Sequence, residues 1–205
     1  MINENVIYKQ ISKDEFKVDE YELASRLGVC SSCLGDRLFE NIPYFMEQVA
    51  PKYTAVKLSV EYLSDDTLKI GEIKIKSKNL IKNLEGASEA YLLAVTLGVE
   101  VDRYLLRLGM MSGAERFVVD GYASALVEAL CDFAEAEIFG DAPHCKRFSP
   151  GYGDLTIDIQ GEILSALSAE NLLGITLTEK KMMVPTKSIT AIIGCKNEEN
   201  NRNTK

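Results

Sequence analysis

Alternating apolar and polar residues predict the first β structure along the chain. The alternation runs through residues 54–62, and after the turn residues 64–66 a second apolar series occupies residues 68–75. Apolar side chains at every second position are typical of a strand with one buried face. We therefore predict a β-hairpin over these two segments, with a bulge at Gly71, where the alternation changes phase.

Three further segments have the composition of strands. Residues 90–97 (AYLLAVTL) are continuously apolar, which indicates a strand buried on both faces, and Gly98 ends it. Residues 175–178 and 189–193 lie on either side of the turn-forming residues 185–188 (PTKS). We predict that these two segments pair with each other as a second hairpin.

Apolar residues at helical spacing predict several helices. The longest, at residues 113–138, has Ser112 in position to cap it, Glu115 three residues later and Gly140 at its end. Helices mixed with hairpins favour an α+β fold, in which an antiparallel sheet with hairpins is packed by helices, one of them long. The predicted helices are residues 13–28, 34–49 (interrupted by Pro43), 77–84, 100–110, 113–138 and 158–173.

The length of 205 residues limits the number of domains, and the formal net charge of −8 limits the classes of partner. We expect a single domain over residues 1–195, followed by a disordered polar tail at 196–205. An acidic chain lacks the basic face that nucleic acids and anionic membranes require, so we expect neither as a partner. The sequence has no run of about 18 apolar residues and no secretion signal, so we expect a cytoplasmic protein.

Five cysteines and a single histidine raise the question of metal or thiol chemistry. Cys30 and Cys33 have the spacing of a redox pair or of half a zinc site, which His144 and Cys145 would complete in number. We favour ordinary thiols and a loop histidine, because the motif is incomplete. The chain also lacks the glycine-rich loops that commonly bind nucleotide phosphates.

The segment with the most binding chemistry is the loop at residues 147–152 (RFSPGY). The planar guanidinium of Arg147 suits a carboxylate, Tyr152 offers a ring face and a hydroxyl, and the Pro-Gly pair gives the loop a defined shape. These groups predict a site for an amino-acid-like ligand, and a rigid turn with an arginine salt bridge is the alternative. On the long helix, Glu128 lies among apolar residues and is the carboxylate that we expect to point inward.

Two blocks of sequence resemble the activation domain of cobalamin-dependent methionine synthase. The loop of that family reads Arg-x-x-Pro-Gly-Tyr, which matches residues 147–152. The family's second block reads Leu-Thr-Glu and then Met-x-Pro-x-x-Ser, which matches residues 177–179 and 183–188. The resemblance is clear over residues 113–194 and covers residues 1–112 only through the order of elements.

The resemblance implies a function. The family's domain binds S-adenosylmethionine, faces the corrinoid of the synthase and supports reductive methylation of inactive cob(II)alamin to methylcobalamin. This chain would do so as a stand-alone subunit. The cobalamin would be carried by methionine synthase or another corrinoid protein, and an electron would come from flavodoxin or another donor. No catalytic acid or base is implied, since the sulfonium methyl is already activated.

The resemblance also implies which residues bind S-adenosylmethionine. Arg147 would hold the ligand's carboxylate, and Glu128 would pair with its ammonium or favour its sulfonium. The implied binding residues are Arg147, Phe148, Ser149, Pro150, Gly151, Tyr152 and Glu128.

Departures from the family pattern leave two other interpretations open. Residues 153–155 are Gly-Asp-Leu where the family commonly has Pro-Ala-Cys, and the family's Tyr-Tyr pair after the last strand has no match. The missing pair favours a non-catalytic chaperone of a corrinoid methyltransferase that does not itself bind S-adenosylmethionine. The third interpretation is a thiol or metal protein that uses Cys30 and Cys33.

The acidic charge of the chain bears on the electron donor. Since flavodoxins are also acidic, we expect flavodoxin to dock mainly on the synthase.

Overall fold

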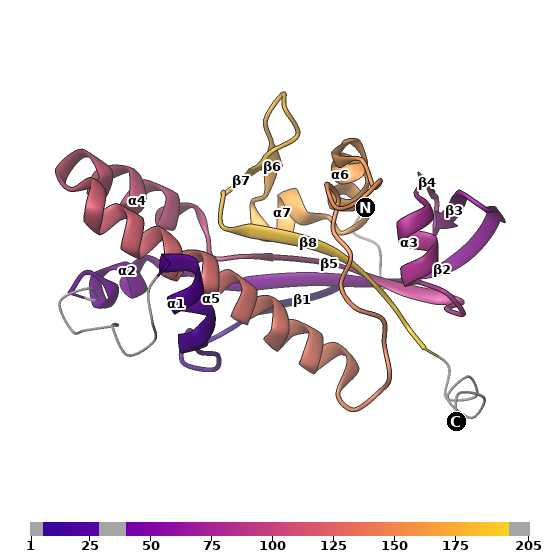
Figure 1. Ribbon diagram of the computed structural model, residues 1–205, viewed down its shortest axis with the longest axis horizontal. Coiled ribbons are helices and arrows are strands. Elements are labelled where there is room, and N and C mark those ends of the chain that lie inside the picture. The colour runs from indigo at the N-terminus through magenta and orange to yellow at the C-terminus, as the bar shows by residue number, and fades with distance from the viewer. Residues whose placement is uncertain (1–5, 29–39, 197–205) are drawn as a thin grey trace.

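An antiparallel sheet forms the middle layer of the computed structural model, which describes residues 6–28 and 40–196 (Figure 1). The main path of the sheet follows the order β4-β3-β2-β5-β8, so β4 and β8 are its edges. Strand β1 shares one side of the long strand β2 with β3, because β1 pairs with residues 52–56 and β3 with residues 60–64. The strands are β1 (Val6–Gln10), β2 (Lys52–Ser64), β3 (Thr67–Ile70), β4 (Ile73–Lys76), β5 (Glu89–Thr96) and β8 (Ser188–Gly194).

Helices cover one face of this sheet with a large apolar core between the two layers (Figure 1). The long helix packs directly on strands β5 and β8. The helices of this first layer are α1 (Glu20–Leu27), α2 (Ile42–Gln48), α4 (Val99–Met111) and α5 (Gly113–Phe139).

A second apolar core lies on the opposite face, under shorter elements. A two-stranded ribbon, β6 (Thr176–Leu177) with β7 (Met183–Val184), stands beside this layer. The layer consists of α3 (Lys78–Asn83), the single 3-10 turn η3 (Ile157–Ile159), α6 (Gln160–Ala166) and α7 (Ala169–Leu173).

The predicted α+β class is confirmed, and so are its two strongest elements. Strand β5 is buried on both faces, since Leu93 belongs to the first core and Leu92 to the second. Helix α5 begins where its sequence indicates, because the Ser112 Oγ accepts a hydrogen bond from the Glu115 N–H at 3.3 Å. Gly140 ends the helix with a φ of +53°, a conformation that glycine adopts without a steric penalty.

The prediction of a bulge at Gly71 was wrong. Gly71 and Glu72 form a tight turn between β3 and β4, in which Ile70 faces Ile73, and Gly71 has a φ of +55°. Residues 68–75 are therefore two short strands, and the register shift in this region lies at Tyr62/Ser64 of β2. A change of phase in an alternating pattern marks a turn as well as a bulge, and the sequence alone does not separate the two.

The predicted second hairpin was also wrong. Strand β6 pairs with β7, whereas β8 pairs along its length with β5 in the main sheet. The reason is burial: Ala191 and Ile193 fill the first core and Ile192 the second, so the strand must lie between two layers.

Three of the predicted helices differ from the observed helices in their bounds. Residues 13–19 are irregular, so α1 begins only at Glu20. Pro43 lies in the first turn of α2 and begins that helix instead of interrupting it, and residues 29–39 lie outside the described residues. The predicted helix at 158–173 is divided into η3, α6 and α7, because Ser168 adopts a left-handed conformation with a φ of +50°.

No helix in the described part of the chain is long and apolar enough to cross a membrane. All but the first residue of the predicted polar tail at 196–205 lies outside the described residues.

Ser168→Gly should stabilise the protein by about 1 kcal/mol, because glycine adopts the left-handed conformation without the penalty of a Cβ. We expect thermal unfolding to show a midpoint about 2–4 °C higher. The matched variant Ser165→Gly, inside α6, should instead lower stability by about 0.5 kcal/mol. A lower melting temperature for both variants would contradict the strain that we assign to Ser168.

Candidate functional site

The chain that follows α5 runs along the outer edge of β8. Phe148 exchanges two backbone hydrogen bonds with Ile192, at 3.0 and 2.8 Å, and the Cys145 N–H donates to the carbonyl of Gly194 at 2.9 Å. This pairing covers the second half of the edge of β8. It also brings the predicted binding loop to the first half of the same edge.

A tight turn at residues 149–152 forms the tip of this loop. The Tyr152 N–H donates to the Ser149 carbonyl at 3.1 Å, and Gly151 has a φ of +93°. Proline in the second position and glycine in the third are the residues that favour a type II turn. The Pro150-Gly151 pair thus gives the loop the defined shape that its sequence indicates.

Asp154 ties the end of the loop to the start of α3. Its carboxylate accepts hydrogen bonds from the Ser77 hydroxyl and from the N–H groups of Lys78 (2.8 Å) and Asn79 (3.2 Å). The bond from Ser77, followed by the two backbone bonds, lowers the pKa of the Asp154 carboxyl, although desolvation acts in the opposite direction. Glycine suits position 153, since its φ of +55° is one that other residues rarely adopt, and a Cβ there would also displace the Asn79 side chain.

A cleft of about 220 Å³ opens beside the turn, at the uncovered part of the edge of β8. Elements from both helical layers border it, with α5 on one side and η3 and α6 on the other. Both sequence blocks that carry the resemblance contribute to it, although 30 residues separate their first positions. The lining residues are Glu128, Ser149, Pro150, Tyr152, Ile157, Gln160, Lys181, Met182, Met183, Ser188, Ile189 and Thr190.

The cleft gathers part of the predicted set. Glu128, Ser149, Pro150 and Tyr152 line it, whereas Phe148 packs against the second core and Gly151 shapes the turn. Arg147, Phe148 and Gly151 are not among the lining residues.

Several lining residues were not predicted from the sequence, and of these Gln160 and Lys181 carry the most chemistry. Gln160 is only 3% exposed, and an amide within a predicted helix gives no sign in the sequence of being buried. Lys181 has a φ of +62° in the turn between β6 and β7 and places a cation at the cleft. No signal in the sequence separates it from the neighbouring Lys180.

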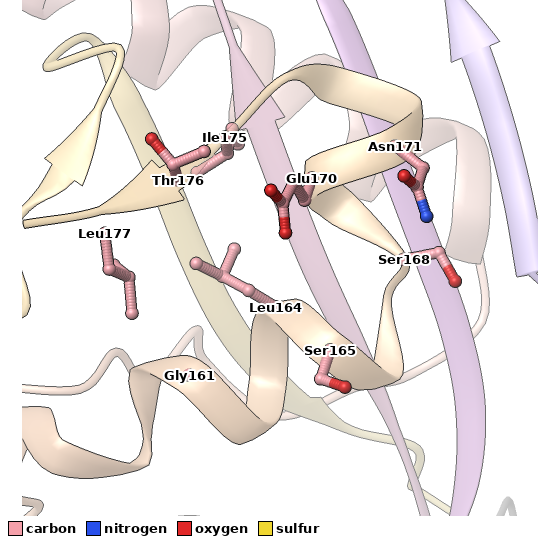
Figure 2. Close-up of a pocket in the computed structure, with 9 residues that line it drawn as sticks. All are labelled: Gly161, Leu164, Ser165, Ser168, Glu170, Asn171, Ile175, Thr176 and Leu177. Carbon is pink, nitrogen blue, oxygen red and sulfur yellow. The ribbon is translucent and has the colours of Figure 1, made fainter.

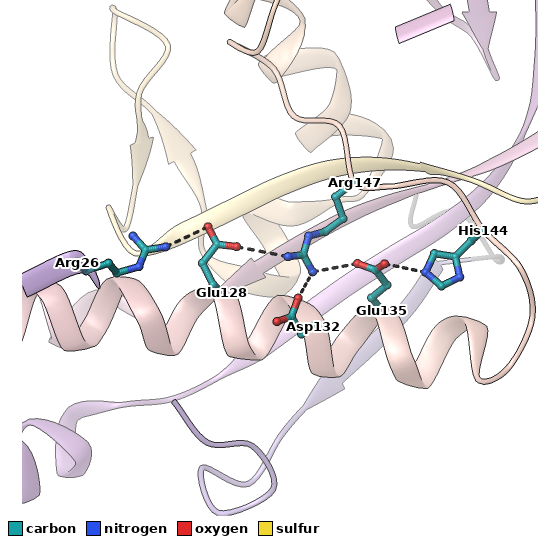
Figure 3. A network of polar contacts seen from close by, with 6 residues as sticks. All are labelled: Arg26, Glu128, Asp132, Glu135, His144 and Arg147. Atoms are coloured by element: carbon teal, nitrogen blue, oxygen red, sulfur yellow. Dashed lines mark hydrogen bonds and ion pairs between the residues drawn. The ribbon is translucent and has the colours of Figure 1, made fainter. Parts of the chain in front are cut away.

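Arg147 lies beside the cleft in a network of charges along α5 (Figure 3). Its Nη1 contacts the carboxylates of Asp132 and Glu135 (2.9 Å), and its Nη2 lies 3.5 Å from Glu128. The other oxygen of Glu128 lies 3.7 Å from the guanidinium of Arg26 on α1. The three carboxylates share one face of α5 because they follow each other at spacings of four and three residues.

Carboxylates outnumber guanidiniums among the described members of this network. Three carboxylates lie beside two guanidiniums, and the ring of His144 contacts Glu135. The Glu135 side chain, 18% exposed, is more buried than that of Glu128, at 35%. Glu135 is therefore the more inward-pointing carboxylate of the long helix, which differs from the expectation for Glu128.

His144 continues the network to the end of α5 and is a structural loop residue in this conformation. Its Nε2 lies 2.8 Å from Glu135 and its Nδ1 lies 2.9 Å from the Ala142 carbonyl. Its ring stacks on Phe139, with centroids 4.3 Å apart. Within residues 6–28 and 40–196, no group of three or more His, Cys, Asp or Glu side chains has an arrangement that could hold a metal ion.

The thiols of the described cysteines are not poised for reaction. Burial raises the pKa of Cys131 to about 12 and also raises the pKa values of Cys145 and Cys195. All three are therefore protonated near neutral pH, and a protonated thiol is a poor nucleophile. Cys30 and Cys33 lie outside the described residues.

A larger cavity of about 560 Å³ lies between α6, α7 and β6 (Figure 2). Its lining is rich in hydroxyls and includes Ser165, Ser168, Thr176 and the carboxylate of Glu170. None of the predicted binding residues lines it. We assign the candidate site to the smaller cleft, because the charged groups and both sequence blocks converge there.

Comparisons with known proteins support the fold. No protein-family model and no curated protein matches this chain. Among solved structures, the chain is similar to one described as the MetH reactivation domain bound to AdoHcy, with a TM-score of 0.71 and 15% sequence identity. The match covers 94% of this chain and 79% of that chain. The chain thus has the fold of a reactivation domain, as the resemblance implied.

Asp154→Asn should loosen the loop, because a neutral amide is a weaker acceptor for the three donors at the start of α3. A lowered folded-state pKa means that the carboxylate stabilises the protein fully above its unfolded pKa of about 3.9 and loses this effect as the pH falls through the folded value. Melting temperatures of parent and variant should therefore differ at pH 7 and converge in acid. Asp141→Asn, at an exposed position after α5, should show no such convergence.

Proposed function

We propose that this chain binds S-adenosylmethionine in the cleft and supports reductive methylation of a corrinoid on a partner protein. The observation that carries the proposal is the meeting of the two resembling sequence blocks at one cleft, beside the acidic face of α5. The solved structure with the same fold is described as bound to AdoHcy, the demethylated product of S-adenosylmethionine. The partner would be cobalamin-dependent methionine synthase or another corrinoid protein.

The charge of the cleft supports this ligand. S-adenosylmethionine carries a sulfonium and an ammonium against one carboxylate, so it has a net positive charge. Glu128 lines the cleft, and the carboxylates of Asp132 and Glu135 follow it on the same face of α5. A carboxylate in this position attracts the ammonium and favours the sulfonium over the neutral thioether of the product.

Two cations are candidates for holding the carboxylate of the ligand. Arg147 is the residue that the resemblance implies, but its guanidinium already contacts three carboxylates. Lys181 lines the cleft directly and lies in the turn of the β6–β7 ribbon. In our proposal Arg147 gives up some of its contacts with the carboxylates of α5 and binds the carboxylate of the ligand instead. Lys181 is the alternative cation for this role.

The proposed role requires positioning rather than acid–base chemistry. A corrinoid on the partner would supply the nucleophile for the methyl group, and flavodoxin or another donor would supply the electron. The residues of this chain would orient the sulfonium and exclude water from it.

The size of the cleft bears on how a partner reaches the ligand. Clefts for ligands of this size usually measure about 300–1,000 Å³. A cleft of about 220 Å³ would leave part of the ligand facing outward, where a partner can approach.

A second candidate function is supported by the same network. If Arg147 stays bound to α5, the chain would be a non-catalytic chaperone that holds a corrinoid protein without S-adenosylmethionine. Calorimetry with the isolated chain, with and without a cobalamin-loaded partner, separates the two functions. Binding of the partner alone would favour the chaperone.

Arg147→Ala should weaken S-adenosylmethionine binding by about 2 kcal/mol, or roughly 30-fold, through loss of a charged hydrogen bond. Titration calorimetry measures the affinity, and the stoichiometry reports the folded fraction. Lys181→Ala is the matched variant at the other candidate clamp. Equal affinity for Arg147→Ala and the parent would remove Arg147 from the site, and a loss confined to Lys181→Ala would transfer the role to that lysine.

Glu128→Gln should weaken S-adenosylmethionine binding about fivefold and S-adenosylhomocysteine binding less, because only the former has a sulfonium. Glu137→Gln is the control, since Glu137 is a carboxylate of α5 that pairs with Lys9, does not contact Arg147 and does not line the cleft. Its affinities should stay within about twofold of the parent. Unchanged affinity of both ligands for Glu128→Gln would contradict our assignment of this carboxylate.

A further inference from the structure

We infer that Gln160 recognises the adenine base of the ligand, by accepting a hydrogen bond from the 6-amino group at its Oε1. This inference rests on the proposed function, because it assigns one end of the same cleft. It goes beyond the resemblance, in which the binding residues are confined to the loop at 147–152 and to Glu128.

Gln160 is a buried amide whose donors are already used. Its side chain lines the cleft, yet the residue is only 3% exposed. Its Nε2 donates to the Thr190 hydroxyl at 2.7 Å and to the sulfur of Met183 at 3.1 Å. A thioether sulfur accepts but cannot donate a hydrogen bond, so Met183 requires the nitrogen, and not the oxygen, on its side of the amide.

This orientation leaves the Oε1 as the free group of the amide. Among the contacts of the described residues, none is a hydrogen bond to this oxygen. The oxygen is not among the fully buried polar atoms that lack a partner, so it keeps some accessible surface, and its residue lines the cleft. A nearly buried amide with an unused acceptor predicts a ligand that donates to it.

The surroundings of Gln160 suit a flat, neutral ring. Ile157, Met182 and Met183 give this end of the cleft apolar and polarizable walls. Helices α6 and α5 lie in different layers (Figure 1). Gln160 belongs to α6 and Glu128 to α5, so the two groups reach the cleft from different layers. The cationic end of the ligand would lie toward Glu128, which leaves the base for the neutral amide.

Backbone groups at the edge of β8 are also available to a ligand in the cleft. Alternate residues of a strand direct their N–H and C=O groups to the same side. Since Ile192 uses both of its groups for Phe148 on the outer side, those of Thr190 point to the same outer side, where the cleft lies. A base beside Gln160 would therefore meet backbone polar groups as well as the amide oxygen.

The test compares S-adenosylhomocysteine with S-inosylhomocysteine, in which a 6-oxo group replaces the 6-amino group. We expect the full chain to prefer the amino compound about tenfold or more in calorimetry, since the oxo group would face the Oε1 with two acceptors and no proton. Gln160→Leu should reduce this preference to about twofold or less.

The ratio of two affinities on one variant does not depend on how much of the variant is folded, so a partly unfolded Gln160→Leu still gives a result. An unchanged ratio in Gln160→Leu, or no preference in the parent, overturns the role of Gln160 and leaves the proposed function intact. If the parent binds neither compound nor S-adenosylmethionine, both proposals fail together.

Discussion

A strand at the edge of a sheet exposes backbone N–H and C=O groups that need partners, and β8 has such an edge. The segment after α5 pairs with its second half through Cys145 and Phe148. Its first half, residues 188–190, borders the cleft. This division of one edge explains why the turn at 149–152, the long helix and α6 all meet at the same place. The location of the candidate site is thus a consequence of strand order, and not of any single motif.

The second constraint is the acidic face of α5. Glu128, Asp132 and Glu135 repel one another on one helix face, and Arg147 lies among them. The arginine therefore has a structural role before any ligand is considered. The same guanidinium can serve the helix and the ligand only if it divides its five N–H donors between them.

Local signals in the sequence predicted much of the fold. Ser112, Glu115 and Gly140 delimit the long helix, and the apolar run at 90–97 forms the doubly buried strand, because capping and burial leave short-range patterns. Features set by distant contacts were not predictable. The pairing of β8 with β5 and the break at Ser168 depend on how layers pack.

In the candidate site too, features set by local sequence were predictable and features set by distant contacts were not. The Pro-Gly turn is local and could be foreseen, whereas the partners of Arg147 and the burial of Gln160 depend on elements that are remote in the chain. The family resemblance directed attention to the loop at 147–152 and to Glu128, and residues of both border the cleft. It gave no indication of Asp154, which anchors the loop where the family pattern differs.

The anchor at Asp154 has a consequence for the energetics of recognition. Three donors at the start of α3 hold the loop from outside the cleft, so its shape does not depend on an occupant. A loop that is already ordered loses little conformational entropy when a small molecule arrives. Preorganisation of this kind lowers the entropic cost of binding for any molecule that enters the cleft.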